Sequence, residues 1–304
     1  MDIGEEKFET TMNIAILITV FNRVEKTLAC FTSLRYSLKN SKDVHIKVFL
    51  TDDGSTDGTK EKVLTSFPDL DIEILPGSGQ LFWNGGMINS WREAVKEGDF
   101  DGYLWLNNDS IILPNLWEEL IAADKYSKSQ FGKGGIYVGS TYNLSKTNIS
   151  YGGFNFINKW TLKDEFVIPN GEFQACEAAH GNITYVSNDV VKTEGVFYEG
   201  YIHSGGDHDY SYLAHKHGYP VFILRDYVGI CENDHKENYG SDFKSLSMKE
   251  RFKYLKSPLG YNLKNTLIFQ RRCFPYRYIP VLIAGYFKAL FPNLSFFIYR
   301  QLRK

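Results

Sequence analysis

The first half of the chain alternates short apolar runs with segments whose apolar residues have helical spacing, and this alternation restricts the fold more than any other feature. The apolar runs, which we interpret as strands, are residues 14–20, 44–50, 72–75 and 103–106. The helical segments that follow them are residues 27–38, 59–67, 86–95 and 114–126. Strands joined through helices of this length predict right-handed crossovers and an α/β fold with a mostly parallel sheet flanked by helices.

The rest of the chain changes character twice. Residues 134–176 place short apolar segments among Gly, Asn and Thr, which indicates irregular or antiparallel structure. Helical spacing returns at 210–217 and again from 245 onward. The sequence has no internal repeat and no Pro- or Ser-rich linker. We therefore expect one α/β domain over residues 1–243 and a helical C-terminal extension over residues 244–304.

The formal net charge of −2 hides a strong asymmetry between these two parts. From Lys244 onward there are thirteen Lys or Arg and one acid, Glu250, a net charge of +12, whereas the preceding 21 basic and 35 acidic residues give −14. A basic segment that is rich in aromatic residues favours an in-plane contact with an anionic membrane surface. Nucleic acid is disfavoured as the partner, because no recognition motif accompanies the charge. The alternatives are packing on the first domain or a homodimer interface.

Neither a membrane-spanning segment nor a secretory leader is predicted. The nearest candidate for a span, residues 278–299, is interrupted by Pro280, Lys288, Pro292 and Asn293. The N-terminus is acidic, unlike a signal peptide. The four cysteines include no Cys-x-x-Cys pair, which fits reduced thiols. We expect a cytoplasmic protein with a peripheral contact at the inner face of the cytoplasmic membrane.

Each of the four predicted strands is followed by a polar, acidic or glycine-rich turn. These turns are residues 19–23 (Thr-Val-Phe-Asn-Arg), 51–57 (Thr-Asp-Asp-Gly-Ser-Thr-Asp), 77–86 (Gly-Ser-Gly-Gln-Leu-Phe-Trp-Asn-Gly-Gly) and 107–110 (Asn-Asn-Asp-Ser). Open α/β sheets bind ligands beyond the carboxyl ends of their strands. The four turns therefore predict a binding site at one edge of the sheet.

Each turn taken alone has a structural and a functional interpretation. Asp52 and Asp53 either form a simple turn or accept hydrogen bonds from a base or a ribose. The Gly-Gly pair at 85–86 either packs closely or lets a helix N-terminus approach a diphosphate. The Asn-Asn-Asp turn at 107–109 either caps the next helix or offers oxygen ligands to Mg²⁺ or Mn²⁺. Trp83 either belongs to the core or stacks on a sugar or base.

Taken together, these motifs resemble the inverting family 2 glycosyltransferases of the GT-A fold, rhamnosyl- and galactofuranosyltransferases among them. The resemblance covers roughly residues 12–235 and follows the family's motif order. Its matching segments are 19–23, 52–57, 83–87 (Trp-Asn-Gly-Gly-Met), 106–110 (Leu-Asn-Asn-Asp-Ser), 180–182 (His-Gly-Asn), 195–197 (Gly-Val-Phe) and 206–210 (Gly-Asp-His-Asp-Tyr).

The resemblance implies a nucleotide-sugar donor, with a UDP or dTDP group. The implied donor-binding residues come from the turns after the predicted strands: Thr19, Asn22, Asp52, Asp53, Trp83, Asn84, Gly85, Gly86 and Asn108.

The resemblance also implies the catalytic groups. Asp109 would ligate Mn²⁺ or Mg²⁺, which stabilises the departing diphosphate, and Asp207 would be the general base that deprotonates the acceptor hydroxyl. The acceptor would be a glycan or lipid-linked glycan in surface polysaccharide biosynthesis. The residues implied to contact it are His180, His208 and Asp209.

The sequence departs from the family pattern at two positions. Gly206 stands before Asp207 in place of a glutamate, so a second acidic contact to the acceptor is missing. Family members often have a metal-binding histidine after the catalytic helix. His235 is our choice for this position over Cys231, because a thiolate is a soft ligand that suits Mg²⁺ poorly. The histidines at 203–217 lack the spacing of a zinc site.

Two other functions are compatible with parts of the sequence. A sugar nucleotidyltransferase is disfavoured, because its Gly-x-Gly-x-Arg loop is absent after the first strand. A non-catalytic carbohydrate-binding module would not need Asp109 and Asp207 together. A nicotinamide enzyme is disfavoured by the lack of Gly-x-Gly-x-x-Gly at the same place.

Overall fold

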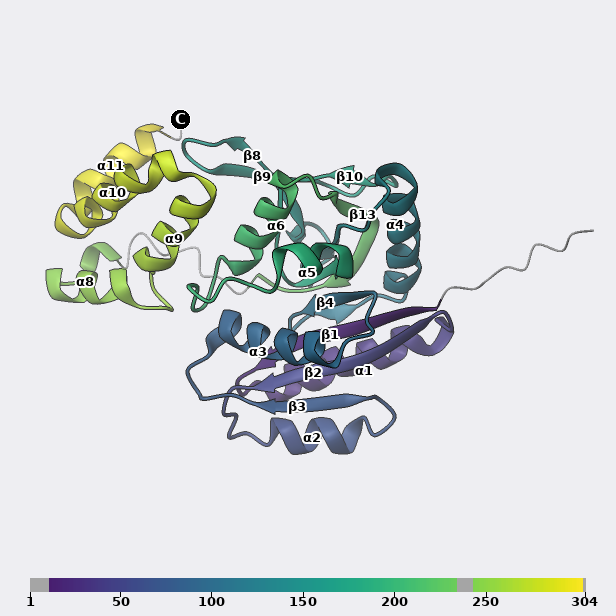
Figure 1. Cartoon of the computed structure of the whole chain (residues 1–304). Helices are drawn as coiled ribbons and strands as arrows, with labels where there is room; N and C mark the ends of the chain where they lie inside the picture. Colours follow the sequence, from purple (N-terminus) through teal and green to yellow (C-terminus); the bar gives the residue numbers. More distant parts are fainter. Residues whose placement is uncertain (1–10, 234–242, 303–304) are drawn as a thin grey trace, which may run out of the picture.

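A large sheet carries the candidate site and defines the fold. The computed structural model describes residues 11–233 and 243–302. The sheet is built from β1 (Met12–Val20), β2 (Val44–Asp52), β3 (Ile72–Pro76), β4 (Gly102–Leu106), β5 (Ile111–Ile112), β6 (Ile136–Tyr142), β7 (Ile149–Tyr151), β10 (Gln174–Ala175), β12 (Ile183–Ser187) and β13 (Val221–Ile230). Its main path runs β10-β13-β6-β12-β4-β1-β2-β3, with β5 beside β13 and β7 beside β6. Figure 1 shows the successive strands β4, β1, β2 and β3.

Strand direction divides this sheet into two regions. In the first region β4, β1, β2 and β3 are parallel neighbours, which confirms the predicted parallel sheet. Antiparallel β12 then separates β4 from β6, which pairs with β13 in parallel. The antiparallel structure expected within 134–176 is found at β7 and β10, and also at β6, which is antiparallel to β7 and β12 and parallel to β13.

Helices cover both faces of the sheet. The first face packs on α1 (Val24–Ser37), α2 (Thr59–Ser66) and α4 (Leu116–Phe131), and the second on α3 (Phe82–Glu97), α5 (Asn188–Glu194) and α6 (Gly206–Lys216). A short 3-10 turn, η1 (Leu38–Asn40), follows α1.

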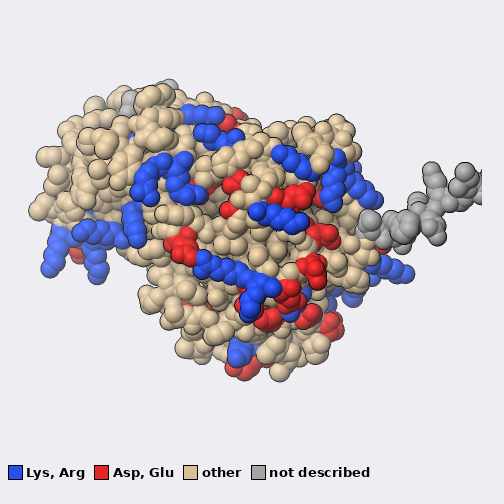
Figure 2. All heavy atoms as spheres, viewed as in Figure 1, with Lys and Arg blue, Asp and Glu red and all other residues tan. Residues whose placement is uncertain are grey.

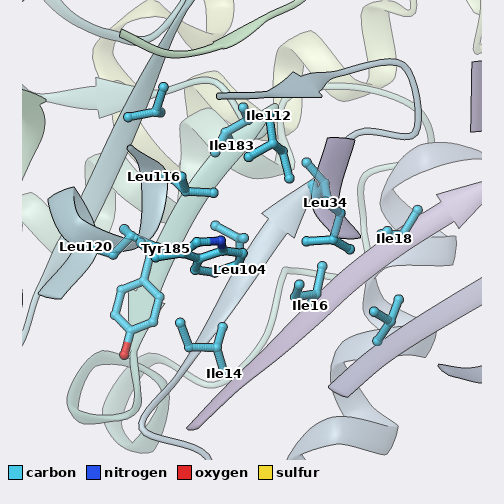
Figure 3. Packing of buried hydrophobic residues seen from close by; sticks show 14 of the residues in the cluster. Ile14, Ile16, Ile18, Leu34, Leu104, Ile112, Leu116, Leu120, Ile183 and Tyr185 are labelled. Carbon is cyan, nitrogen blue, oxygen red and sulfur yellow. The ribbon is translucent and has the colours of Figure 1, made fainter. Parts of the chain in front are cut away.

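Strand β1 is buried on both faces, which explains its continuous apolar sequence. Ile14, Ile16 and Ile18 pack toward Leu34 of α1, as Figure 3 shows, whereas Ala15 and Leu17 pack toward α3. Burying each large aliphatic side chain stabilises the fold by about 1.5–3 kcal/mol.

A second sheet lies over α6. Its strands are β8 (Gly153–Asn158), β9 (Lys163–Phe166) and β11 (Ala178–Ala179), in the antiparallel order β11-β8-β9. Strand β11 contacts α6 directly. Helix α6 therefore lies between this small sheet and the large one, on which its Tyr210 and Ala214 pack.

The C-terminal extension is helical, as expected. It contains α8 (Met248–Lys256), α9 (Leu263–Cys273), the 3-10 turn η2 (Pro275–Arg277), α10 (Tyr278–Leu290) and α11 (Pro292–Leu302). Of these helices, α9 contacts α6 and is the nearest to it in Figure 1. Helix α9 starts at Leu263 because the Asn262 side chain accepts the Asn265 N–H. Within the described ranges, no helix has both the length and the apolar character needed to cross a bilayer.

Candidate active site

Asn22 joins the turns after β1 and β2 through two hydrogen bonds. Its N–H donates to Ser55 Oγ at 2.8 Å, and its Oδ1 accepts from the Thr56 N–H at 2.9 Å. Asn22 has φ 57°, a left-handed conformation that asparagine tolerates better than most residues. The structure thus brings Asn22 and the turn that contains Asp52 together at one edge of the sheet, as predicted.

Asp52 and Asp53 lie in different surroundings. The half-buried Asp52 accepts one hydrogen bond, from the Ser55 N–H to Oδ1 at 2.8 Å. Asp53 is buried and accepts from Gly79 N–H at 2.7 Å and from the N–H groups of Leu81 and Phe82 at 2.8 and 3.0 Å. Asp53 therefore holds the turn after β3, whereas Asp52 has an oxygen without a donor among the described residues.

Asp53 also explains why α3 begins earlier than the sequence indicated. The predicted helix covers 86–95, but α3 begins at Phe82. Its first amides need acceptors, and Asp53 supplies one from a distant part of the chain. The predicted donor residues at 83–86 consequently lie in the first turn of a helix rather than in a loop.

Within this turn, Gly86 is buried against Thr19 at the end of β1. A Cβ at position 86 would overlap Thr19 Oγ1, so a side chain cannot be accommodated there. Gly86 allows α3 to approach β1 closely, which supports the structural interpretation of this glycine, whereas Gly85 is partly exposed.

Asn84 holds the loop that leads to α6. It is fully buried, and its Nδ2 donates to the carbonyl oxygens of Tyr198 and Tyr201, both at 3.2 Å. Its Oδ1 abuts Gly206 so closely that a Cβ there would overlap it. Asn84 therefore occupies the space that a glutamate at position 206 would need, which accounts for the departure from the family pattern.

Trp83 links the turn after β4 to the start of α6. Its Nε1 donates to Asn107 Oδ1 at 2.8 Å, while its half-buried ring lies against Gly181 and packs on Phe197 at 5.5 Å. The Gly181 N–H in turn donates to Asp207 Oδ2 at 2.9 Å. Trp83 thus lies between the candidate metal-binding turn and the candidate base.

Asp109 and Asn108 have separate roles in the turn after β4. Asn108 is buried, and its Nδ2 donates to Thr27 Oγ1 at 3.0 Å, so this side chain fastens the turn to α1. Asp109 forms an ion pair with Arg23 at 3.1 Å, and the Cys231 thiol lies 3.7 Å from its Oδ1. Burial, together with the charge of Asp109, raises the pKa of Cys231 to about 12, so this thiol is neutral at pH 7.

Of the two predicted metal ligands, the structure describes Asp109 alone. The described residues contain no group of three or more His, Cys, Asp or Glu side chains arranged around a common point, and His235 lies outside the described residues. Mg²⁺ is often bound through one or two carboxylates and the oxygens of substrate phosphates. A lone carboxylate at Asp109, beside a neutral thiol, fits a cation of that kind.

Asp207 lies in the first turn of α6. Besides the bond from Gly181, its Oδ2 is 3.9 Å from His208 Nε2. Its side chain is 15% exposed, and Oδ1 has no donor among the described residues. Asp207 is thus a fixed, accessible carboxylate, which is what a general base requires.

His180 packs edge-on against His208, with ring centroids 4.8 Å apart, and contacts Phe154 and Phe166. Its Nδ1 lies 2.9 Å from the carbonyl oxygen of Gly152, which can only accept, so Nδ1 carries the proton. Burial, reinforced by His208, lowers the pKa of His180 to about 4. His180 is therefore neutral near pH 7.

Asp209 points away from this group. It is buried, and both oxygens accept from Arg272 Nε of α9, at 2.8 and 2.9 Å. The Tyr201 hydroxyl donates to Oδ1 at 3.0 Å. This geometry favours a structural role for Asp209 over the predicted acceptor contact.

Three residues of the site were missed by sequence reasoning. Asn107 belongs to the Asn-Asn-Asp turn, so the motif itself is the signal that could have indicated its contact with Trp83. Gly181 acts through its backbone N–H, which no sequence pattern indicates. Arg272 lies 63 residues from Asp209 in a segment without a motif.

The chain is similar to known proteins in both sequence and structure. Residues 15–171, slightly more than half of the chain, match the model of "Glycosyl transferase family 2". No curated protein sequence gives a significant match. The structure of S. aureus TarS 1–349 in complex with UDP superposes with a TM-score of 0.59 at 12% identity, over 95% of this chain and 92% of that chain.

Two further solved structures are similar. S. aureus TarS 1–349 in complex with UDP-GlcNAc has a TM-score of 0.56 at 13% identity, over 91% of this chain and 81% of that chain. The mannosyltransferase PcManGT from Pyrobaculum calidifontis, in complex with GDP-Man and Mn²⁺, has a TM-score of 0.53 at 13% identity, over 90% and 73%. At this identity the likeness shows the fold. Together with the family match, it shows that the chain belongs to glycosyl transferase family 2 and has the GT-A fold.

Proposed function

We propose that the chain is an inverting glycosyltransferase that moves a sugar from a nucleotide-sugar donor to a hydroxyl of a glycan acceptor, in assembly of a surface polysaccharide. The observation that carries the proposal is Asp207, an accessible carboxylate held by Gly181 in the first turn of α6. In a direct displacement, its free oxygen removes the proton of the acceptor hydroxyl as that oxygen attacks the anomeric carbon. One base and one displacement give a product of opposite anomeric configuration.

For the donor, we propose a UDP- or dTDP-sugar. Asp52 has an oxygen left to accept from the base or ribose, and Asn22 fixes the turn in which Asp52 lies. Asp53 acts indirectly, because its oxygens hold the start of α3. The UDP and UDP-GlcNAc complexes of S. aureus TarS support a donor of this class.

Asp109 is the residue that would hold a divalent cation, Mn²⁺ or Mg²⁺, with His235 as a further ligand. When bound, such a cation offsets the negative charge that develops on the departing diphosphate. The Mn²⁺ complex of PcManGT supports this assignment. Arg23, paired with Asp109, places a second positive charge beside the same carboxylate.

We propose that His208 and the neutral His180 contact the acceptor. His208 is half-buried beside Asp207, and His180 lies behind it with its Nδ1 proton committed to Gly152. Because His180 is neutral, it can form a hydrogen bond without adding a positive charge that would pair with the carboxylate of Asp207.

The function is tested by measuring which nucleotide sugars raise the melting temperature of the full chain, with and without Mn²⁺, because a ligand that binds the native state stabilises it. Stabilising donors are then incubated with glycan acceptors, and NMR spectroscopy gives the anomeric configuration of the product. Inversion, together with loss of transfer in Asp207→Asn, is expected. A product with retained configuration would exclude the mechanism, and donor binding without any transfer would favour a binding module.

We also propose that α10 and α11 contact the cytoplasmic face of a membrane. Helix α10 exposes apolar side chains with spacings of four, three and four residues, and α11 continues this surface. Its members are Ile279, Ile283, Tyr286, Leu290, Phe291, Leu294, Phe297 and Ile298. Figure 2 shows Lys and Arg around the C-terminal helices, where few acids lie. An apolar surface bordered by cations fits the interface of an anionic bilayer.

Flotation with anionic liposomes tests this contact on the full chain. Truncation before Lys244 would remove Arg272 and expose Asp209, so point variants are preferable. Ile283→Glu with Phe297→Glu is expected to abolish flotation, whereas the same substitution at exposed Leu144, outside the extension, leaves it unchanged. Loss of a dimer in solution, with unaltered flotation, would instead assign the surface to a homodimer.

A further inference from the structure

The C-terminal extension forms a cavity together with the loop that precedes α6. Its volume is about 640 Å³, within the range of sites that bind small molecules. Helices α8, α9 and α10 provide most of the wall, and Tyr198 and Gly200 of the loop complete it. The apolar and aromatic part of the lining is Leu255, Leu263, Leu267, Ile268, Tyr278 and Tyr286.

The same cavity is lined by three cations. These are Lys256 at the end of α8 and Lys264 and Arg271 on α9. Lys264 and Arg271 are seven residues apart, so they project from the same face of the helix. Among the described residues that line the cavity there is no acid. The lining therefore combines an apolar wall with a positive charge that nothing in that wall neutralises.

The cavity lies between the proposed membrane contact and the loop that leads to the candidate base. Tyr286 belongs both to its lining and to the exposed apolar surface of α10, so the cavity opens beside the proposed membrane contact. On the other side, Gly200 precedes Asp207 by seven residues, which limits their separation to about 25 Å. An extended oligosaccharide can bridge that distance.

Helix α9 joins the cavity to the candidate base. A neighbouring face of the helix holds the loop before α6, because Asn265 Nδ2 donates to the Ser204 carbonyl oxygen at 3.0 Å. Arg272 on the same face pairs with Asp209, two residues after Asp207. A ligand that binds to Lys264 and Arg271 therefore contacts the same helix, α9, that holds the candidate base in position.

We propose that this cavity binds the phosphate-bearing end of the lipid that anchors the acceptor glycan. The phosphate pairs with Lys264 and Arg271, and the chain leaves along the apolar wall toward the membrane. This assignment rests on the proposed function, because the lipid is that of the acceptor. A bulk phospholipid would not need a cavity beside the loop that leads to the base.

Binding of farnesyl phosphate to the full chain tests the proposal without donor or transfer, so a failure of the proposed function would leave this measurement interpretable. Calorimetry is expected to show saturable binding, with much weaker binding of farnesol and of inorganic phosphate. Lys264→Gln with Arg271→Gln should weaken binding roughly tenfold or more, because two charges that contact the phosphate are lost. Lys249→Gln with Lys253→Gln is the matched control, since both lysines are exposed on α8 and lie outside the cavity lining.

Three results would overturn the assignment. Equal weakening in the two pairs would show a general effect of charge, and unchanged binding in the first pair would place the ligand elsewhere. Displacement of farnesyl phosphate by an equal concentration of short-chain phosphatidylglycerol would assign the cavity to bulk lipid. In kinetics, Lys264→Gln with Arg271→Gln is expected to raise KM for a glycan on a phosphorylated lipid and to leave KM for the same glycan without lipid unchanged.

Discussion

Arg272 Nε lies 2.8 and 2.9 Å from the two carboxylate oxygens of Asp209, so the C-terminal extension is bonded to the helix that carries the candidate base. Asp209 is almost completely buried, whereas Arg272 remains partly exposed. Asn265 adds a second contact across the predicted boundary, through Ser204. The change of charge at Lys244 therefore does not mark a break in packing, because the extension is hydrogen-bonded to the helix that carries the candidate base and to the loop before it.

Arg272→Met is expected to lower the free energy of unfolding by about 3 kcal/mol, because it leaves the buried carboxylate of Asp209 without a cation. The double variant Asp209→Asn with Arg272→Met should recover more than half of this loss, since the uncompensated charge is gone. Urea denaturation measures both. Arg271→Met, at the exposed neighbouring position, is the control, and an equal effect in it would show that the ion pair contributes little.

Substitution of Asp53 is expected mainly to lower the free energy of unfolding, whereas substitution of Asp52 is expected mainly to weaken nucleotide binding. Asp53→Ala leaves three backbone N–H groups without an acceptor and should cost about 2–3 kcal/mol of unfolding free energy. Asp52→Ala removes one hydrogen bond, from Ser55, and should cost less while weakening nucleotide binding more. Denaturation and calorimetry on both variants check this. If Asp52→Ala bound nucleotide normally, the nucleoside contact would have to lie elsewhere.

The parallel sheet was predictable because β1 is buried on both faces over residues 14–18, and a strand buried on both faces is apolar there. The positions of the turns at the strand ends followed from the same alternation. The start of α3 was not predictable. Its first amides are satisfied by Asp53, some 28 residues earlier, and local periodicity carries no information about an acceptor at that distance.

The candidate site, like the fold, was predictable from the sequence only in part. The resemblance to family 2 glycosyltransferases pointed to Asp109 and Asp207 as the candidate metal ligand and base, and the structure connects them through Asn107, Trp83 and Gly181. The connection depends on a side-chain packing contact and a backbone N–H, which leave no mark in the sequence. Asp209, two residues after Asp207, has the same residue type but faces Arg272, because residues two apart point to different sides of a helix.

Asp207→Asn should lower kcat by a factor of roughly 10²–10⁴ and leave donor affinity and melting temperature nearly unchanged. The asparagine keeps an oxygen that accepts from the Gly181 N–H, so the turn is preserved while the base is lost. Initial rates and calorimetry separate the two effects. Asp226→Asn, at an exposed acid of β13, is the control. Near-normal turnover in a folded Asp207→Asn enzyme would mean that another group takes the proton.

His180 is expected to make stability pH-dependent. Its pKa is about 4 in the folded protein, because of burial and His208, against 6.5 for an ordinary histidine. Between these values the unfolded chain binds the proton that the folded protein excludes, so stability is present above pH 6.5 and is lost as the pH falls toward 4. From pH 7 to pH 5 the loss should be about 2 kcal/mol.

His180→Gln removes this titration and retains an N–H that can donate to the Gly152 carbonyl oxygen. The variant should therefore lose less stability than the wild-type protein between pH 7 and pH 5, by about 2 kcal/mol, as measured by urea denaturation at each pH. Parallel pH profiles for the two proteins would show that His180 is as readily protonated in the folded state as in the unfolded one.

Asp109→Ala is expected to abolish the part of donor affinity that depends on Mn²⁺, a change of roughly tenfold or more. Calorimetry with and without Mn²⁺ separates this part from metal-free binding. Metal-free affinity should not fall, because the substitution removes a negative charge that would repel the diphosphate. Cys231→Ala should retain the Mn²⁺ response, since the neutral thiol is not a ligand for a hard cation. An unchanged Mn²⁺ response in Asp109→Ala would remove this carboxylate from the metal site.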